Sequence, residues 1–317
     1  MTTQLTDPEP QLQRDRYGRP LIVPPQGGKP VPYTRATTLA GTLDDLHGLT
    51  LWKQRMTAIG ITDRADLQVA VAAHRDDKHR LNKIVQDAMD AAAADAAATT
   101  GTALHSFCEQ IDRGQELGAV PGAFEADLEA YRTTTRHLSH LHIEQGCVLD
   151  DLTVHGTPDR ISEHEGELVV ADIKTGSISF PGKIGLQLAL YAHGQAYDHT
   201  TGQRRPWADD RPVSTTRAII IHLPAGQGIC TLHEVDIAAA WEAVDLAVKV
   251  RDWRKRSNAI TRRLPDETPG ELLAQAIAKA PTVEALNGLW NEYHRHWDAS
   301  HTKAAAARKA SLTTAVA

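Results

Sequence analysis

The spacing of apolar positions changes character near the middle of the chain. In the first part, apolar side chains recur at helical intervals, and the alanine-rich stretch 88–98 favours helix strongly. We expect one or two short helices within residues 34–61, a helical region over 63–113 that breaks at Thr99-Thr100-Gly101, and a helix over 124–141. The first part of the chain therefore predicts a helical lobe.

After residue 147 the pattern alternates with a period of two, which is typical of half-buried strands. Short β-favouring runs follow one another, and two of them are joined by a predicted hairpin turn around Gly166. We expect strands over residues 148–150, 154–161, 168–174, 217–223 and 230–235, with helices over 184–197 and 237–255. This mixture of strands and helices predicts an α/β domain.

Composition shifts mark the two ends of this domain. Residues 1–32 are rich in Pro, Gly, Gln and Arg, which predicts an irregular arm. A turn-rich segment begins near Leu264, and two helices are expected after it, over 271–279 and over 283–296, the second with an alternative end at Ala310. We therefore predict three parts, namely the arm over 1–32, a main domain over 33–262 that includes the helical lobe, and a C-terminal helical hairpin over 263–317.

Length and composition narrow the class of protein. A chain of 317 residues with 41% hydrophobic residues can bury one sizeable α/β core and a smaller appendage. Its three cysteines, Cys108, Cys147 and Cys230, have no C-x-x-C spacing, which supports neither a disulfide framework nor a zinc ribbon. No apolar run approaches the roughly 20 residues of a membrane span, and the polar N-terminus has no signal-peptide core. We expect a protein of the reducing cytoplasm that has no membrane as partner.

Charge is distributed unevenly along the chain. The formal net charge of −6 argues by itself against nucleic acid as a partner, because DNA binding depends on neutralising phosphates. Residues 249–263, however, hold seven basic side chains against the single acid Asp252, a local charge of +6, so the remainder carries −12. This run, which includes Arg254, Lys255 and Arg256, is either a solvated helix face or a groove that follows DNA.

A carboxylate and an ammonium share one face of the strand predicted over residues 168–174. Alternate residues of a strand point the same way, so Asp172 and Lys174 lie side by side, while Val169, Ala171 and Ile173 point into the core. Asp159 on the neighbouring strand can bring a second carboxylate, and Pro158 before it interrupts the ladder. Two carboxylates suit one or two Mg²⁺ or Mn²⁺ ions, which lower the pKa of a water and make it a nucleophile. Lys174 could position that water or stabilise the pentavalent phosphate.

In their order along the chain, these residues resemble the motifs of the PD-(D/E)XK nuclease superfamily, and more closely those of its RecB-like branch. That branch carries a G-x-x-x-H helix motif, a G-x-P-D segment, a D-x-K-T-G strand end and a Q-x-x-x-Y helix. Single matches are weak, since D-x-K recurs at residues 76–78, but order and context make the resemblance specific. The four pieces here are Gly101 to His105, Gly156 to Asp159, Asp172 to Gly176, and Gln187 to Tyr191.

The resemblance implies a fold and a set of roles. The fold would be a restriction-endonuclease-like core, in which helices flank a mixed central sheet, with the helical lobe and the hairpin attached. The implied catalytic residues are Asp159, Asp172 and Lys174, and Gln187 and Tyr191 would contact the DNA strand near the cleaved phosphate. The implied metal ligands are His105, Glu144, Asp159, Asp172 and the backbone carbonyl of Ile173. Glu109, on the same helix face as His105, is a further candidate ligand.

The cysteine count separates the chain from several relatives in this branch. Those relatives, such as the CRISPR-associated adaptation nuclease, hold an iron–sulfur cluster on four cysteines, and three scattered cysteines cannot do so. We expect no iron–sulfur cluster. By analogy, the chain is similar to a stand-alone phage-type exonuclease that resects DNA ends for recombination or replication in the host cytoplasm. A single-strand annealing protein or a recombinase is the partner that this analogy implies.

Two other functional classes stay open. The same fold could serve an endonuclease or junction resolvase, which predicts a dimer that cuts closed circles. It could also serve a non-catalytic DNA-binding relative, against which the intact acid pair and lysine argue. A zinc site at His137, His140 and His142 is disfavoured, because at a predicted helix end the third imidazole leaves the shared face.

Overall fold

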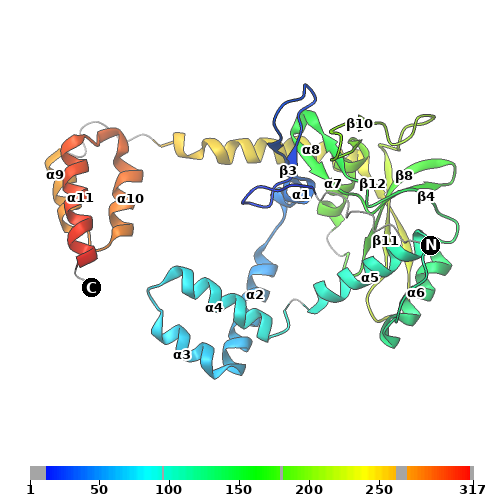
Figure 1. The fold of residues 1–317 in the computed structure, drawn as a ribbon, viewed down its shortest axis with the longest axis horizontal. Coiled ribbons are helices and arrows are strands. Elements are labelled where there is room, and N and C mark those ends of the chain that lie inside the picture. The colour runs from blue at the N-terminus through cyan, green and yellow to red at the C-terminus, as the bar shows by residue number, and fades with distance from the viewer. Residues whose placement is uncertain (1–11, 95, 179–180, 262–269, 315–317) are drawn as a thin grey trace, which may run out of the picture. The chain divides into compact units, whose positions relative to one another are not determined.

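The computed structural model describes residues 12–94, 96–178, 181–261 and 270–314 (Figure 1). The chain divides into two compact units, Met1–Asp252 and Trp253–Ala317, and every described strand belongs to the first. The first unit therefore has α/β architecture, and the described part of the second is helical. The domain boundary predicted between residues 262 and 263 lies outside the described residues and stays a prediction.

The described part of the arm is more ordered than its composition predicts. Within it, β1 (Leu21–Ile22) pairs antiparallel with β2 (Val31–Pro32), so the expectation of a wholly irregular arm is wrong. Ile22 is fully buried and packs with Tyr33, which anchors this ladder. The lobe follows, with the elements β3 (Thr34–Arg35), α1 (Ala36–Ala40), α2 (His47–Asp63), α3 (Ala65–Ala73) and α4 (Lys78–Ala91).

The break predicted at Thr99-Thr100-Gly101 does not occur. The chain turns earlier, around Ala93 with its φ of 52°, and α5 (Ala96–Asp112) runs through the Thr-Thr-Gly sequence. Gly101 serves close packing instead, because a Cβ there would lie 2.6 Å from Oγ1 of Thr175. The glycine therefore lets α5 approach the end of β8 (Glu167–Lys174).

Five strands form the sheet that carries the predicted acids. Only the β8–β11 pair is parallel, and α7 (Pro181–Ala192) lies in the connection between these two strands, as a parallel pair requires. The spatial order is β12 (Thr231–Asp236), β11 (Arg217–His222), β8, β7 (Arg160–His164) and β4 (Ser139–Ile143). A second sheet has the order β10 (Arg204–Arg205), β9 (Gln195–Tyr197), β5 (Cys147–Leu149), β6 (Val154–Gly156) and β3.

Three predicted element bounds are wrong. The strand expected over 154–161 is two strands in different sheets, β6 and β7, and Pro158, which has no N–H to donate, lies in the gap between them. Helix α6 (Gly122–Thr135) ends before residue 141, and β4 follows it. The helix expected to reach residue 197 ends with α7 at Ala192, and β9 follows it. The sequence pattern joined elements that a short turn separates.

Strand β8 is buried on both faces, although a half-buried strand was expected. Val169, Ala171 and Ile173 pack with α5 and α6, whereas Leu168 and Val170 pack with α7 and α8 (Ile237–Arg256). Figure 1 shows α5 and α6 along one side of this sheet. By strand alternation, Asp172 belongs to the face that α7 covers.

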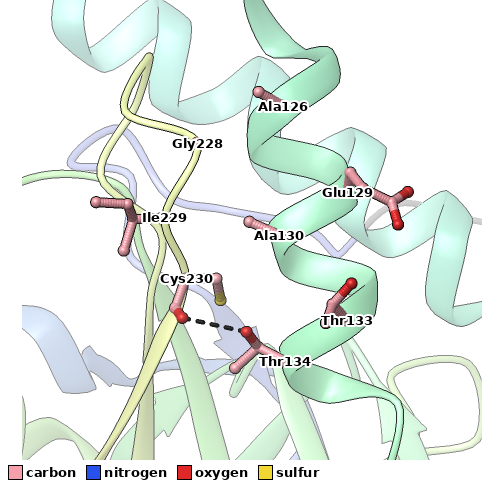
Figure 2. Close-up of a pocket in the computed structure, with 8 residues that line it drawn as sticks. All are labelled: Ala126, Glu129, Ala130, Thr133, Thr134, Gly228, Ile229 and Cys230. Carbon is pink, nitrogen blue, oxygen red and sulfur yellow. Dashed lines mark hydrogen bonds between the residues drawn. The ribbon is translucent and has the colours of Figure 1, made fainter.

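Helix α6 is fastened to the turn between β11 and β12. Figure 2 shows Thr134 donating a hydrogen bond of 3.1 Å to the carbonyl of Cys230, beside the small side chains of Ala126 and Ala130. Asp127, which is fully buried, accepts two backbone N–H groups of the turn, each at 2.7 Å. The turn between the last two strands is thereby held against the helix layer.

Beyond α8, the described part of the second unit has three α-helices where two were predicted. The additional helix begins because the carboxylate of Asp298 accepts the backbone N–H groups of Ser300 and His301, at 2.8 and 3.0 Å. The three helices are α9 (Gly270–Lys279), α10 (Val283–Tyr293) and α11 (Ala299–Thr314). No helix in the described ranges has the length and apolar character that a membrane span needs.

Replacing Gly156 by alanine should destabilise the first unit. A Cβ at Gly156 would lie 2.2 Å from Cε1 of Tyr191, which is 3% exposed and cannot move into solvent. We expect Gly156→Ala to lower the free energy of unfolding by about 1–3 kcal/mol, the usual cost of overpacking. Urea unfolding measures the change. Gly118→Ala is the control, because nothing lies within 4 Å of its new Cβ, and equal effects of both substitutions would contradict the packing argument.

Candidate active site

The candidate site forms where β7 begins and β8 ends. Asp159 directly precedes β7, and Asp172 and Lys174 lie at the end of β8. The two strands pair antiparallel, and Oδ2 of Asp159 accepts the backbone N–H of Ile173 at 2.7 Å. This hydrogen bond ties the two strand ends together, so the structure brings the two predicted acids to one place.

Lys174 forms an ion pair with Asp172. Its Nζ contacts Oδ2 of Asp172, a buried oxygen with no hydrogen bond of regular geometry to any described residue. The Asp172 side chain is 2% exposed, whereas that of Lys174 is 27% exposed. The pair therefore combines a buried carboxylate with an ammonium that reaches solvent.

Burial makes negative charge on the two acids costly. Burial, and then the nearby Asp159 carboxylate, raises the pKa of Asp172 to about 6, although Lys174 opposes the shift. Burial also raises the pKa of Asp159, against the Ile173 N–H and the charges of Lys174 and Arg160. Two neighbouring carboxylates that resist ionisation are typical of a site that holds a cation or moves protons.

His105 approaches the acids from α5. Its Nδ1 lies 3.5 Å from Oδ2 of Asp159. Burial lowers the pKa of His105, although the Asp172 charge opposes this shift. The imidazole is therefore neutral at neutral pH, which is the form in which histidine binds a metal.

Glu144 stands at a bend just after β4. Its φ of 54° is uncommon for a residue with a side chain, and its N–H donates to the carbonyl of Asp159 at 3.0 Å. Burial, and then the charge of Asp159, raises the pKa of Glu144 to about 7. Its Oε1 lies 3.7 Å from Nη1 of Arg160. A backbone contact with Asp159 thus holds this third acid beside the other two.

On α7, Gln187 and Tyr191 form a bonded pair. Nε2 of Gln187 donates to the Tyr191 hydroxyl at 2.9 Å, as their i,i+4 spacing predicts. Burial, and then the charge of Asp172, raises the pKa of the Tyr191 hydroxyl. The hydroxyl therefore stays protonated and keeps a fixed partner next to the acids.

The donors at this site fit a hard divalent cation. Carboxylate and carbonyl oxygens with one neutral imidazole are ligands that Mg²⁺ and Mn²⁺ accept. The buried Oδ2 of Asp172, which the Lys174 ammonium contacts, is an oxygen that a cation would satisfy. Within the described ranges, however, no three His, Cys, Asp or Glu side chains are clustered as a complete metal site. Waters or substrate oxygens would have to complete the coordination, as is usual for Mg²⁺.

The structure adds residues that the sequence pattern did not indicate. Arg160 is 1% exposed and donates through Nη1 to the carbonyl of Asp159 at 2.6 Å. Asp112, at the end of α5, accepts Nε of Arg160 and the hydroxyl of Tyr131, each at 2.6 Å. One local indication of the role of Arg160 lay in the sequence, where this charged residue directly follows Pro158-Asp159 and begins a buried strand.

Other candidates lie elsewhere or have different partners. Arg254, Lys255 and Arg256 end α8 within the second unit, whereas the acids belong to the first. Arg262 and Arg263 of the same basic run lie outside the described residues. Glu109, considered as a further ligand, pairs with Arg113 at 2.9 Å.

The three histidines considered for zinc have separate surroundings. His140 and His142 lie on β4, where the first bonds to Ser162 at 2.8 Å and the second to the carbonyl of Trp207 at 2.7 Å. The ring of His137 lies against that of His164, with 5.5 Å between their centroids. The described residues thus give no support to a zinc site here.

A cleft adjoins the acids on the side of Glu144. It lies between the bend at Glu144 and the connection from β9 to β10, and Asp198 is the other acid that lines it. The Asp198 carboxylate is already used, because it accepts the N–H groups of Thr200 and Thr201 at 2.8 and 3.3 Å. The other lining residues include Arg113, Gln145, His199, Gln203 and Arg205. Arg113 already pairs with Glu109, and Gln145 donates to the carbonyls of Gly146 and Tyr197, whereas Arg205 is exposed.

One protein-family profile matches a range of the chain that contains the whole candidate site. A family profile described as PD-(D/E)XK nuclease superfamily matches residues 67–269, a range that contains every site residue from His105 to Tyr191. No curated protein matches the chain. Together with the mixed sheets and their flanking helices, the match confirms the predicted restriction-endonuclease-like α/β fold.

Asp172→Asn should stabilise the protein when no divalent metal is present. The folded-state pKa of Asp172, about 6, lies above the roughly 3.9 of an exposed aspartate, so stability is lost as the pH rises from about 4 to about 6. Asparagine does not ionise, so at pH 7.5 we expect a free energy of unfolding about 1–3 kcal/mol higher than that of the wild type.

Urea unfolding in EDTA at several pH values measures this difference. It should shrink steadily as the pH falls from about 6 towards about 4, because Asp172 then becomes protonated in the folded wild type. Asp76→Asn, at an exposed position, is the control. A stabilisation that does not change with pH would contradict the assigned cause.

Proposed function

The chain belongs to the PD-(D/E)XK nuclease superfamily, and from this we propose that it is a metal-dependent deoxyribonuclease that digests DNA from its ends. Membership implies nuclease activity that uses a divalent metal. Within the superfamily, we propose the RecB-like branch and an activity like that of phage-type exonucleases. The proposed role is resection of DNA ends for recombination or replication in the cytoplasm, together with a single-strand annealing protein or a recombinase.

The arrangement of Asp159, Asp172 and Lys174 carries the proposal. The carboxylate of Asp159, whose side chain is 14% exposed, accepts the N–H of Ile173, the residue after the buried Asp172, and the Lys174 ammonium reaches from Asp172 towards solvent. In the proposed reaction the two aspartates hold the metal. Lys174 positions the attacking water or stabilises the negative charge that develops on the phosphate.

His105, Glu144 and the carbonyl of Ile173 are proposed to complete the protein's share of the metal ligands. Mg²⁺ or Mn²⁺ at this place would polarise the phosphate and lower the pKa of a water. The neutral imidazole of His105 supports its role, since a protonated imidazole cannot ligate. We propose that no iron–sulfur cluster takes part.

The DNA strand is proposed to pass between α7 and the cleft beside Glu144. Gln187 and Tyr191 would contact it next to the scissile phosphate, because their bonded pair adjoins the acids. The donors that line the cleft, among them the exposed Arg205, suit phosphate oxygens. Arg254, Lys255 and Arg256 would add contacts that do not depend on sequence.

Metal-dependent digestion of end-labelled linear DNA, beside a covalently closed circle, tests the function. We expect the linear DNA to be degraded with Mg²⁺ or Mn²⁺ and the circle to persist. Asp172→Ala and Lys174→Ala should each reduce the rate by about 100-fold or more, since positioned catalytic groups usually contribute that much.

The chain offers a matched control for these variants. Asp76 and Lys78 repeat the D-x-K spacing at exposed positions outside the site, so Asp76→Ala and Lys78→Ala should digest DNA like the wild type. Losses of only a few-fold in the Asp172 and Lys174 variants would refute the site. Cleavage of the circle would contradict the proposed exonuclease activity and indicate an endonuclease of the same fold. Binding of DNA without digestion would indicate a non-catalytic relative.

The salt dependence of DNA binding separates the two proposed contact regions. Neutralising Arg254, Lys255 and Arg256 should reduce the slope of log affinity against log salt by up to about three units, near 0.9 for each phosphate contact. Arg205→Gln should reduce it by about one unit if the cleft receives the backbone. Fluorescence anisotropy in Ca²⁺ measures both. An unchanged slope would mean that the substituted residues are a solvated surface.

A further inference from the structure

Arg160 is a charged side chain inside the core of the first unit. It is 1% exposed, and a buried charge is costly unless it is paired and hydrogen-bonded. Its Nε donates to Oδ2 of Asp112, and its Nη1 donates to the carbonyl of Asp159, each at 2.6 Å. Its Nη2 is buried and has no hydrogen-bond partner among the described residues. The guanidinium is therefore held at two points that belong to different elements.

Asp112 fixes the guanidinium of Arg160 through its Nε. Its Oδ2 also accepts the hydroxyl of Tyr131 at 2.6 Å, and its Oδ1 lies 3.4 Å from Nε2 of His140. His140 in turn bonds to Oγ of Ser162 at 2.8 Å. Side chains from α6, β4 and β7 thus converge on a carboxylate of α5, and this carboxylate is only 4% exposed.

Another nitrogen of the guanidinium, Nη1, contacts two of the proposed ligand residues. The carbonyl of Asp159 accepts both Nη1 of Arg160, at 2.6 Å, and the N–H of Glu144, at 3.0 Å. The same Nη1 lies 3.7 Å from Oε1 of Glu144. A displacement of Arg160 would therefore release the backbone of Asp159 and the side chain of Glu144 together.

We propose that Arg160 is a positioning residue, which Asp112 holds in place and which fixes Asp159 and Glu144 for binding the divalent metal. The inference rests on the proposed function, because it concerns the same metal site. It assigns to Arg160 no contact with the metal or with DNA. Its effect passes through the two acids.

A purely structural role explains the arrangement less well. Buried ion pairs are often no more stabilising than apolar side chains of similar volume, so the stability of the core does not by itself explain the Arg160–Asp112 pair. The contacts of Arg160 lead directly to Asp159 and Glu144, the groups proposed as ligands. Partners that orient ligand groups typically change metal affinity by about 10–100-fold when they are replaced.

Titration of the full chain with Mn²⁺ by calorimetry, together with thermal unfolding of the same samples, tests the proposal. Arg160→Lys keeps the charge but cannot bond to both Asp112 and the Asp159 carbonyl, so we expect about 10–100-fold weaker Mn²⁺ binding. Asp112→Asn keeps the size of the side chain and should weaken binding in the same direction. The double variant should bind about as weakly as the weaker single variant, because the two residues act as a unit.

The control is Arg217→Lys, which changes an arginine that pairs with Glu165 at 2.8 Å, away from the acids. Its Mn²⁺ affinity should equal that of the wild type. If Arg160→Lys and Asp112→Asn lower the melting temperature but bind Mn²⁺ normally, the network is structural and the proposal is wrong. If Arg160→Lys does not fold, the Mn²⁺ affinity of Asp112→Asn tests the proposal by itself. A wild-type protein that neither binds Mn²⁺ nor digests DNA would instead refute the proposed function.

Discussion

The site is governed by one electrostatic constraint, which is that two carboxylates lie close together with little access to water. Asp172 is 2% exposed, and Asp159 is near enough to raise its pKa, so water screens their repulsion poorly. Unpaired buried charges cost several kcal/mol each, so the surrounding fold has to provide compensation. Lys174 pairs with Asp172, the N–H of Ile173 bonds to the Asp159 carboxylate, and the charge of Arg160 favours ionised Asp159.

Backbone features bring these donors within reach. Pro158 lies in the gap between the two sheets, so the Asp159 carboxylate can bond to the N–H of Ile173 instead of facing outward from a regular strand. Two glycines then allow helices to approach the strand ends, since neither Gly101 nor Gly156 has space for a Cβ. Because these two positions have no side chain, the helix with His105 and the helix with Gln187 can pack close to the acids.

Residues whose roles depend on near neighbours were predictable from the sequence. The contact of Asp172 with Lys174 follows from strand alternation, and the bond from Gln187 to Tyr191 follows from helix spacing. Burial of β8 on both faces had a signal in the sequence, the uninterrupted apolar run from Leu168 to Ala171, but the alternation of Asp172 and Lys174 at its end favoured a half-buried strand. Arg160 was missed because a charged residue suggests exposure, and its partner Asp112 is 48 residues away in the sequence. Such pairs arise only from tertiary packing.

Strand β8 acquires its second neighbour late in the chain. Its partner β7 precedes it directly, but β11 follows only after α7, β9 and β10. During synthesis, the strand that bears Asp172 therefore keeps an open edge over residues 171–174 until residue 222 of the 317 has emerged from the ribosome. A chain terminated before that point would carry every acid of the centre on an unfinished sheet. Such a fragment would expose an unpaired strand edge and would be prone to aggregate.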